Sequence, residues 1–315
     1  MTISRDDVQE AAARIAGRVR PLLVSTVEAG AAGAFSLTFA HEYLQHTGSF
    51  KARGAANLAA FHLAAGSMPA AGITIASGGN AGLACAWAAQ ATGTTATVFL
   101  PESAPPFKVS KLRGYGADVR LIPGEYSAAL AASNAYAEES GALRSHAYDN
   151  PKISAGAGTL AVEILERSPQ VNTVVVAVGG GGLLAGIVAA LDGSGVRTVG
   201  VEPRHCRALS AALEAGGPVD VTNASVAADS LGAHRVSQDA FDLASTEAVT
   251  SLLVDDEAIV AARQWLWDTR RVVVEVGGAA ALAALLSRAY VPEPDEHVVA
   301  ILCGANTDPG DLVER

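Results

Sequence analysis

The feature that most constrains the fold is a repeated alternation of short apolar segments with longer helical segments. The short segments are rich in Val, Ile and Leu and have the length of buried strands. Strands that alternate with helices of this length are typical of βαβ units, in which helices cover both faces of a parallel sheet. The alternation predicts strands at residues 72–77, 95–101, 117–123, 173–178, 197–203 and 297–304, and helices at residues 83–92, 105–116, 125–140, 254–269 and 279–290.

Length and composition suggest about two domains or one large α/β unit. The chain has 315 residues, of which 50% are hydrophobic and 17% are charged, so it can bury a sizeable core. No linker rich in Ser or Pro divides the alternating segments. We therefore expect two open parallel-sheet domains that are interleaved in the sequence.

Charge and cysteine content exclude several classes of protein. The net charge of −10 argues against a nucleic-acid partner, because phosphates require a basic surface. Three cysteines without metal-like spacing make disulfides unexpected and favour a reducing cytoplasm. The N-terminus has early acidic residues instead of a secretory signal, and Ser4 and Asp7 predict a capping box that opens an amphipathic helix.

One uncharged segment, residues 173–191, is nearly long enough to cross a membrane. Four consecutive glycines, Gly179, Gly180, Gly181 and Gly182, stand at its centre and would disrupt a single helix. We therefore predict a buried strand, a loop and a buried helix, with no membrane partner.

The loops that follow the predicted strands hold the candidate binding residues. In an open parallel sheet, ligands bind beyond the carboxyl ends of the strands. Four glycines at the start of a helix favour a phosphate site, because their N–H groups can approach an anion closely. A nicotinamide-dependent dehydrogenase is an alternative, since Gly180, Gly182 and Ala185 fit G-x-G-x-x-A and Glu202 follows at the required distance.

Two further loops carry polar groups suited to a small substrate. "SGGNAG", residues 77–82, places the Ser77 hydroxyl and the Asn80 amide at another helix start, which suits a carboxylate. "CGAN", residues 303–306, puts Cys303 at the end of a buried strand, where a cysteine is commonly a small core residue. The segment "LQHTGSFKARGA" places Lys51 among small residues, which is unusual for a solvated lysine.

Together these motifs resemble the pyridoxal-phosphate (PLP) enzymes of the tryptophan-synthase-β fold, and within them the serine/threonine dehydratases. The resemblance extends from about Leu44 to Asn306 and implies a smaller domain at residues 40–150, inserted into a larger domain formed by residues 1–39 and 151–315. The matching motifs, in family order, are "LQHTGSFKARGA", "SGGNAGLACAWAA", "YDNPKISAGAGT", "VGGGGLLAG", "VGVEP", "ADSLG" and "CGAN".

The resemblance implies a role for each candidate residue. Lys51 forms the Schiff base with the cofactor, and Cys303 faces the pyridine nitrogen as a neutral thiol, which makes the ring a weaker electron sink. The implied cofactor-binding residues are Phe50, Lys51, Asn80, Gly179, Gly180, Gly181, Gly182, Glu275 and Cys303, and the implied substrate-binding residues are Ser77, Gly78, Asn80, Ala81 and Gly156.

The implied activity is β-elimination from L-threonine or L-serine, which releases a 2-keto acid and ammonia. The alternatives are a 3-hydroxyaspartate ammonia-lyase, a serine racemase-like enzyme and a PLP-binding scaffold without turnover. Gly78 disfavours the racemase, because serine racemases that resemble this family carry a second serine there. No metal site is expected, since no carboxylate stands near Glu202 in the following segment, and the resemblance suggests a homodimer.

The chain departs from the family pattern at several positions, and the departure at Ala157 bears on the substrate. The family usually has Gly-Gln-Gly-Thr where this chain has Ala157 at the second position, and Glu-Pro where it has Glu275 followed by Val276. The given sequence ends shortly after "CGAN", so no C-terminal regulatory domain is expected.

Overall fold

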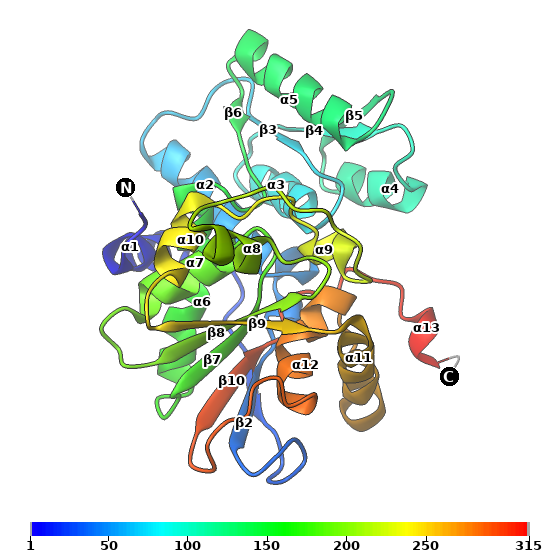
Figure 1. Ribbon diagram of the computed structural model, residues 1–315. Helices are drawn as coiled ribbons and strands as arrows, with labels where there is room; N and C mark the ends of the chain where they lie inside the picture. Colours follow the sequence, from blue (N-terminus) through cyan, green and yellow to red (C-terminus); the bar gives the residue numbers. More distant parts are fainter. Residues whose placement is uncertain (1, 314–315) are drawn as a thin grey trace.

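Residues 2–313 are described by a computed structural model, in which the helices pack around two separate sheets (Figure 1). The smaller sheet has four parallel strands in the order β5-β4-β3-β6. Its strands are β3 (Ile73–Ala76), β4 (Ala96–Pro101), β5 (Asp118–Ile122) and β6 (Leu143–Arg144), and its helices are α2 (Lys51–Ala64), α3 (Asn80–Ala91), α4 (Pro106–Gly114) and α5 (Tyr126–Ser140).

The larger sheet has six strands in the order β1-β2-β10-β7-β8-β9. Its strands are β1 (Val24–Thr26), β2 (Ser36–Ala40), β7 (Thr173–Ala177), β8 (Arg197–Pro203), β9 (Val249–Val254) and β10 (His297–Ile301). The other helices are α1 (Arg5–Ile15), α6 (Pro151–Arg167), α7 (Gly182–Leu191), α8 (Ala208–Ala215), α9 (Ala228–Leu231), α10 (Gln238–Ala244), α11 (Asp256–Arg270), α12 (Ala280–Leu286) and α13 (Gly310–Val313), with short 3-10 helices η1 (Glu42–Leu44), η2 (His46–Gly48) and η3 (Val276–Ala279).

The predicted α/β class and the six predicted strands are confirmed. The predicted parallel sheets are present, and one edge differs from the parallel arrangement, since β1 pairs with β2 antiparallel. Strands β1, β2, β6 and β9 were not predicted. Strand β6 has only two residues, and β1 has three, so neither carries a readable apolar pattern.

Local sequence signals explain where several helices begin. At α1, the Ser4 hydroxyl accepts a hydrogen bond from the Asp7 N–H, and the Asp7 carboxylate accepts one from the Ser4 N–H, so the predicted capping box is present. At α6, the side-chain oxygen Oδ1 of Asn150 accepts hydrogen bonds from the N–H groups of Lys152 and Ile153, and Pro151 occupies the first helical position.

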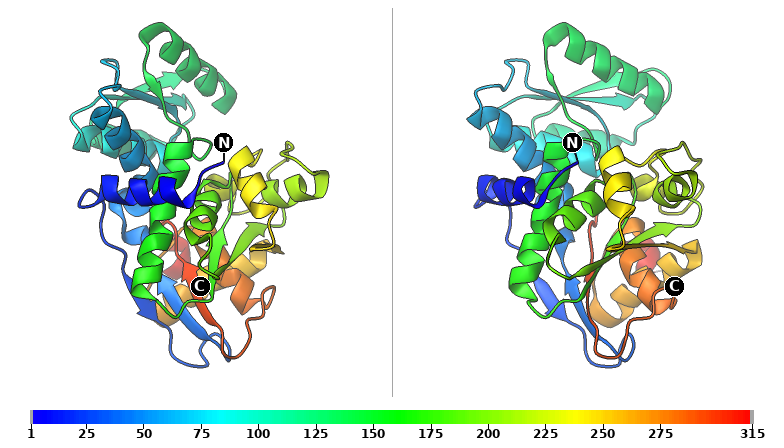
Figure 2. Two further views of the ribbon diagram at one scale, coloured as in Figure 1. Left: turned by 90° about the vertical axis from the view of Figure 1, so that its left-hand side faces the viewer. Right: turned by 60° about the vertical axis from the view of Figure 1, so that its left-hand side comes forward.

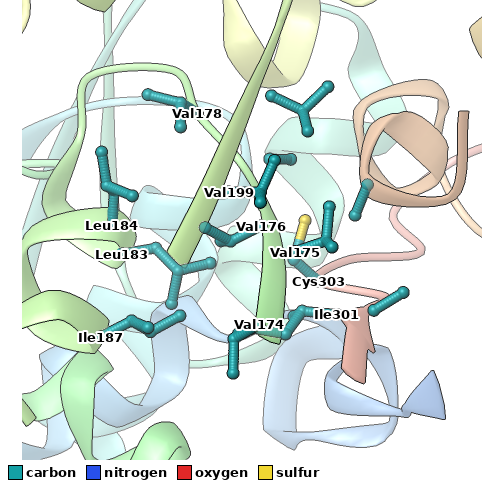
Figure 3. Close-up of a cluster of buried hydrophobic side chains, with 14 of the residues drawn as sticks. Val174, Val175, Val176, Val178, Leu183, Leu184, Ile187, Val199, Ile301 and Cys303 are labelled. Atoms are coloured by element: carbon teal, nitrogen blue, oxygen red, sulfur yellow. The ribbon is translucent and has the colours of Figure 1, made fainter. Parts of the chain in front are cut away.

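The uncharged segment is the centre of the larger core. It forms β7, a glycine loop and α7, as predicted, and its side chains pack with those of β8 and β10 (Figure 3). Val174, Val175 and Val176 are completely buried, which follows from a central parallel strand being covered on both faces. Across residues 2–313, no helix combines the length and the apolar character that crossing a membrane requires.

The two sheets lie at opposite ends of the molecule, with α6 packed against both α2 and α7 (Figure 2). All four strands of the smaller sheet fall within residues 40–150. The division into domains at residues 40 and 150 stays a prediction.

Candidate active site

A cavity of about 440 Å³ opens between the two sheets, and loops from the carboxyl ends of β3, β4, β7 and β10 line it. This is where ligands bind in open parallel sheets. The predicted residues that line it are Phe50, Lys51, Ser77, Gly78, Asn80, Ala81, Gly179, Gly180, Gly181, Gly182, Glu275 and Cys303.

Lys51 is the first residue of α2, and its side chain lies in the cavity wall. Its amine donates a hydrogen bond to the Ala147 carbonyl across 2.5 Å and lies 4.7 Å from the centre of the Phe50 ring. Burial lowers the pKa of Lys51 to about 8, because the surrounding protein solvates an ammonium poorly. A part of the lysine population is therefore neutral near pH 7, as a nucleophile or base requires.

The glycine loop is shaped to hold an anion. Gly181 has a φ of 89°, which side chains rarely adopt, and a Cβ on Gly180 would overlap the ring of Tyr148. Within the described part of the chain, the N–H groups of Gly179, Gly180 and Gly181 donate no hydrogen bond. Together with the N-terminus of α7 they leave free donors in the cavity wall, which suits a phosphate.

A second set of free donors lies at the N-terminus of α3. The N–H groups of Gly78 and Gly79 have no hydrogen-bond acceptor among the described residues, and both residues line the cavity. Ser77 and Ala81 flank them in the same wall. This end of α3 can therefore bind a carboxylate.

A hydrogen-bonded group of three side chains joins the loops. Asn80 Nδ2 donates to Glu275 Oε1 across 2.8 Å, and the Asn306 N–H donates to Glu275 Oε2 across 3.2 Å. Asn306 Nδ2 donates to Asn80 Oδ1 and to the Thr47 carbonyl, each across 2.6 Å. A Cβ on Gly304 would overlap the Glu275 carboxylate, so this glycine leaves the space that the group occupies.

The lysine loop meets the "CGAN" loop directly. Ser49 and Gly304 form an isolated β-bridge, and the Phe50 N–H donates to the Cys303 carbonyl across 3.0 Å. Cys303 is 4% exposed, and burial raises the pKa of its thiol to about 12. The thiol is therefore neutral at physiological pH.

Comparison with known proteins agrees with this geometry. The sequence model described as "Pyridoxal-phosphate dependent enzyme" matches residues 18–304. The chain belongs to this pyridoxal-phosphate-dependent enzyme family. The L-threonine ammonia-lyase of Geobacter sulfurreducens is 36% identical over 308 residues, which cover 96% of this chain and 75% of that protein.

Two further proteins are similar to this chain. The phenylserine dehydratase of Ralstonia pickettii is 34% identical over 276 residues, covering 87% of this chain and 83% of that protein. The structure of maize serine racemase superposes with a TM-score of 0.90 at 28% identity, covering 100% of this chain and 97% of that chain.

Gly156 is the one predicted site residue that the structure keeps away from the cavity. It lies inside α6, where a Cβ would come within 2.7 Å of the Arg53 carbonyl and 2.8 Å of Gly54 Cα. Its lack of a side chain therefore lets α6 pack closely on α2. The assignment of Gly156 to the substrate carboxylate stays a prediction.

Several residues of the cavity, and Asn306 beside it, were not predicted from the sequence. Asn306 belongs to the "CGAN" motif, but nothing in the sequence indicates that its side chain reaches Asn80. Tyr148 lies in the segment between β6 and α6, whose apolar pattern is weak. Other lining residues that were not predicted come mainly from loops and helix ends, and they include Leu100, Pro101, Ala104, Pro105, Lys108, Tyr126, Ala147 and Asp229.

Glu202 has a different role from the one that a dinucleotide site requires. It is fully buried at the end of β8, and its two carboxylate oxygens accept from the N–H groups of Leu209 and Ser210, each across 2.8 Å. The Glu202 carboxylate therefore accepts hydrogen bonds from N–H groups in the first turn of α8 and is not available to bind a ribose. The dehydrogenase alternative loses its acidic residue, and family membership assigns the cofactor as pyridoxal phosphate.

Proposed function

We propose that the protein is a PLP-dependent ammonia-lyase, which converts L-threonine or L-serine into a 2-keto acid and ammonia. The observation that carries the proposal is the buried amine of Lys51, whose pKa is lowered to about 8, in a cavity lined by unpaired N–H donors. The names of the similar proteins support the same reaction class.

The residues present fit the cofactor. Free N–H groups of Gly179, Gly180 and Gly181 can bind its phosphate, and the Lys51 amine can bind its aldehyde carbon. One hydrogen of Asn80 Nδ2 is used by Glu275, so the second is available for the ring oxygen. The neutral thiol of Cys303 is the proposed partner of the ring nitrogen.

When bound, pyridoxal phosphate supplies an electron sink that acidifies the proton on the α-carbon of an amino acid. Lys51 Nζ is the base proposed to take this proton, since its lowered pKa leaves part of the amine neutral near pH 7. The N–H groups of Gly78 and Gly79 hold the substrate carboxylate, and Ser77 and Ala81 flank it. Loss of the β-hydroxyl and reaction with water then yield the 2-keto acid and ammonia.

Racemisation is the second candidate, because a serine racemase shares the fold. Gly78 offers no acid to return a proton, and a Cβ there would lie 2.9 Å from Leu100 Cδ2, so the adjoining space is filled by an apolar group. We therefore expect the lyase to release keto acid without forming D-serine.

Assembly and location complete the proposal. The three cysteines are buried and free, which supports a location in the reducing cytoplasm. Leu23 and Leu44 are 59% and 41% exposed, and the backbone of each is hydrogen-bonded to that of His41. These exposed apolar side chains support a homodimer. Sedimentation equilibrium tests the dimer: a single species of monomer mass contradicts it.

The lyase is tested by incubating the PLP-loaded protein with L-threonine and L-serine and measuring keto acid and ammonia. We expect equal amounts of both products, and a loss of kcat by at least about 10³-fold in Lys51→Ala. Lys111→Ala is the matched control, because Lys111 is an exposed lysine on α4 that is not among the residues lining this cavity. Cofactor binding without keto acid would instead indicate an inactive scaffold.

A further inference from the structure

One wall of the cavity has no role in the cofactor and carboxylate assignments above. Its side chains are apolar or aromatic, and they come from the end of β4, the following loop, the start of α5 and the loop before α6. We call these six residues the β-wall: Leu100, Pro101, Ala104, Pro105, Tyr126 and Tyr148.

The β-wall adjoins the groups that handle the reacting carbon. Leu100 Cδ2 lies 2.9 Å from the position that a Cβ on Gly78 would take, so the wall begins at the proposed carboxylate site. At the other side, the Lys51 amine is bonded to the carbonyl of Ala147, the residue before Tyr148. A substrate held between Gly78 and Lys51 would therefore direct its β-substituent along this wall.

Tyr148 presents a fixed aromatic surface. Its hydroxyl donates to the Arg235 carbonyl across 3.0 Å, and its ring meets the His146 ring edge-on, with centroids 4.8 Å apart. Its backbone carbonyl accepts a hydrogen bond from the Ser154 hydroxyl across 3.1 Å. Side chains with few remaining rotamers lose little entropy when they bind a flat apolar group.

Tyr126 lies at the open side of the same wall. It begins α5 and is 55% exposed, yet burial raises its pKa, as is expected for a phenol in a concave surface. Burial also raises the pKa of Tyr148, and the nearby Tyr126 adds to this shift. Both tyrosines line the same cavity.

The charges around the cavity disfavour a second carboxylate on the substrate. Among the described residues that line the cavity, the cations are Lys51 and Lys108. Lys51 is assigned to the chemistry, and Lys108 Nζ is paired with Asp229 Oδ1 across 2.9 Å. Asp229 and Glu275 add negative charge to the same lining, so another carboxylate would be desolvated there without a free partner.

We propose that the β-wall is the subsite for the β-substituent of the substrate, and that it selects neutral apolar groups, up to the size of an aromatic ring, over an acidic group. Burial of apolar area against Leu100 and the two tyrosines favours such groups. This inference rests on the proposed lyase and chooses its substrate class: β-hydroxy amino acids with a neutral side chain, in preference to 3-hydroxyaspartate.

The subsite can be tested separately from elimination by ligands that lack a β-hydroxyl. The PLP-loaded protein is titrated with L-phenylalanine, L-alanine and L-aspartate, and each Kd is read from the change in absorbance of the bound cofactor. We expect L-phenylalanine to bind at least tenfold more tightly than L-aspartate. Equal affinity, or tighter binding of L-aspartate, would overturn the inference even in an active lyase. These Kd values can be measured and compared even if the protein releases no keto acid from threonine or serine.

Two variants locate the selectivity. Tyr126→Ala should lower the ratio of L-phenylalanine to L-alanine affinity at least threefold, and Tyr126→Phe should restore it, because the ring and not the hydroxyl makes the contact. An unchanged ratio in Tyr126→Ala contradicts the proposed contact.

Asp229→Asn removes a negative charge and releases Lys108, so the preference for L-phenylalanine over L-aspartate should fall at least threefold. Asp118→Asn is the matched control, since Asp118 is a paired and exposed aspartate on β5 that does not line the cavity. It should leave the preference unchanged. Equal behaviour of the two variants contradicts the electrostatic part of the inference.

Discussion

The side-chain amide of Asn80 donates a hydrogen bond to the carboxylate of Glu275 across 2.8 Å, although 195 positions separate the two residues in the sequence. Asn80 is the first residue of α3, which packs against the smaller sheet. Glu275 immediately precedes η3, which lies beside the larger sheet. Asn306 bonds to both of them. The three side chains therefore connect the two halves of the protein at the cavity.

Glu275→Gln tests whether this connection supports cofactor binding. The side-chain amide of Asn80 and the backbone N–H of Asn306 each donate to a different oxygen of Glu275, whereas a glutamine has only one side-chain oxygen. One donor is left unpaired, and we expect the Kd for PLP to rise about tenfold, a change of about 1.4 kcal/mol. Equilibrium titration of the apoprotein measures this value.

The control for this variant is Glu247→Gln, because Glu247 is exposed and away from the cavity lining. A Kd that stays within a factor of two in Glu275→Gln would show that the three-residue group has no role in holding the cofactor.

The pH dependence of cofactor uptake follows from Lys51. Only the neutral amine can attack the cofactor aldehyde, and burial lowers the pKa of Lys51 to about 8. The rate at which the apoprotein takes up PLP should therefore rise as pH increases to about 8 and level off above it. Stopped-flow absorbance measures the rate. A rise that continues toward pH 10, as for an ordinary exposed lysine, contradicts the assignment.

The same shift predicts the direction of a stability change in the apoprotein. The unfolded chain holds a proton on Lys51 up to its ordinary pKa of 10.5, whereas the folded chain releases it near 8. Between these values the unfolded state binds more protons, so this residue makes folding more favourable as pH rises from about 8 to 10.5. Thermal unfolding of wild type and Lys51→Met across that range should diverge accordingly, and parallel curves would be inconsistent with a buried lysine.

The parts of the fold that the sequence predicts are those set by local pattern. The uncharged run of β7 and the segment of β8 are short, apolar and bounded by turn residues, and both strands form where they are expected. Strand β9 was missed because its pattern is only partly apolar, with Thr250 exposed at its start. The antiparallel edge β1 depends on pairing with β2 and has too few residues to show a period.

The candidate site divides in the same way. Lys51 and the glycine loop carry their chemistry in local motifs, so they can be found without coordinates. Tertiary packing alone brings Asn306 to Asn80 and the Tyr148 ring to Gly180. Gly156 lies outside the cavity lining and lets α6 approach Arg53 and Gly54 on α2, a contact that appears only in the structure, because a helix-packing glycine and a ligand-binding glycine look alike in a sequence.

The glycine loop should tolerate no side chain. In Gly181→Ala the φ of 89° becomes strained and the new Cβ would overlap Ala240, so the loop must move. We expect PLP affinity to fall at least about 100-fold, or about 2.7 kcal/mol. Gly195→Ala is the matched control, because Gly195 has a φ of 77° with nothing within 4 Å. If both variants bind PLP like the wild type, the loop is not the phosphate site.

Stability should depend on the buried ion cluster beside the catalytic helix. Arg53 is fully buried on α2 and bonds to Glu42 through two hydrogen bonds and to Glu163 across 2.5 Å. Arg53→Met leaves the buried Glu42 unpaired, which should cost about 3–5 kcal/mol of unfolding free energy. Arg144→Met, which removes an exposed arginine paired with Glu138, should cost no more than about 1 kcal/mol. Urea denaturation compares the two, and similar losses would contradict this reading.

The most direct test asks which lysine carries the cofactor. The chain has four lysines, Lys51, Lys108, Lys111 and Lys152, so the alternatives are few. The PLP-loaded protein is reduced with borohydride, digested and mapped by mass spectrometry. We expect a pyridoxyl group on the peptide that contains Lys51, and no label in Lys51→Ala. Labelling of another lysine in the wild-type protein, or full turnover by Lys51→Ala, contradicts it.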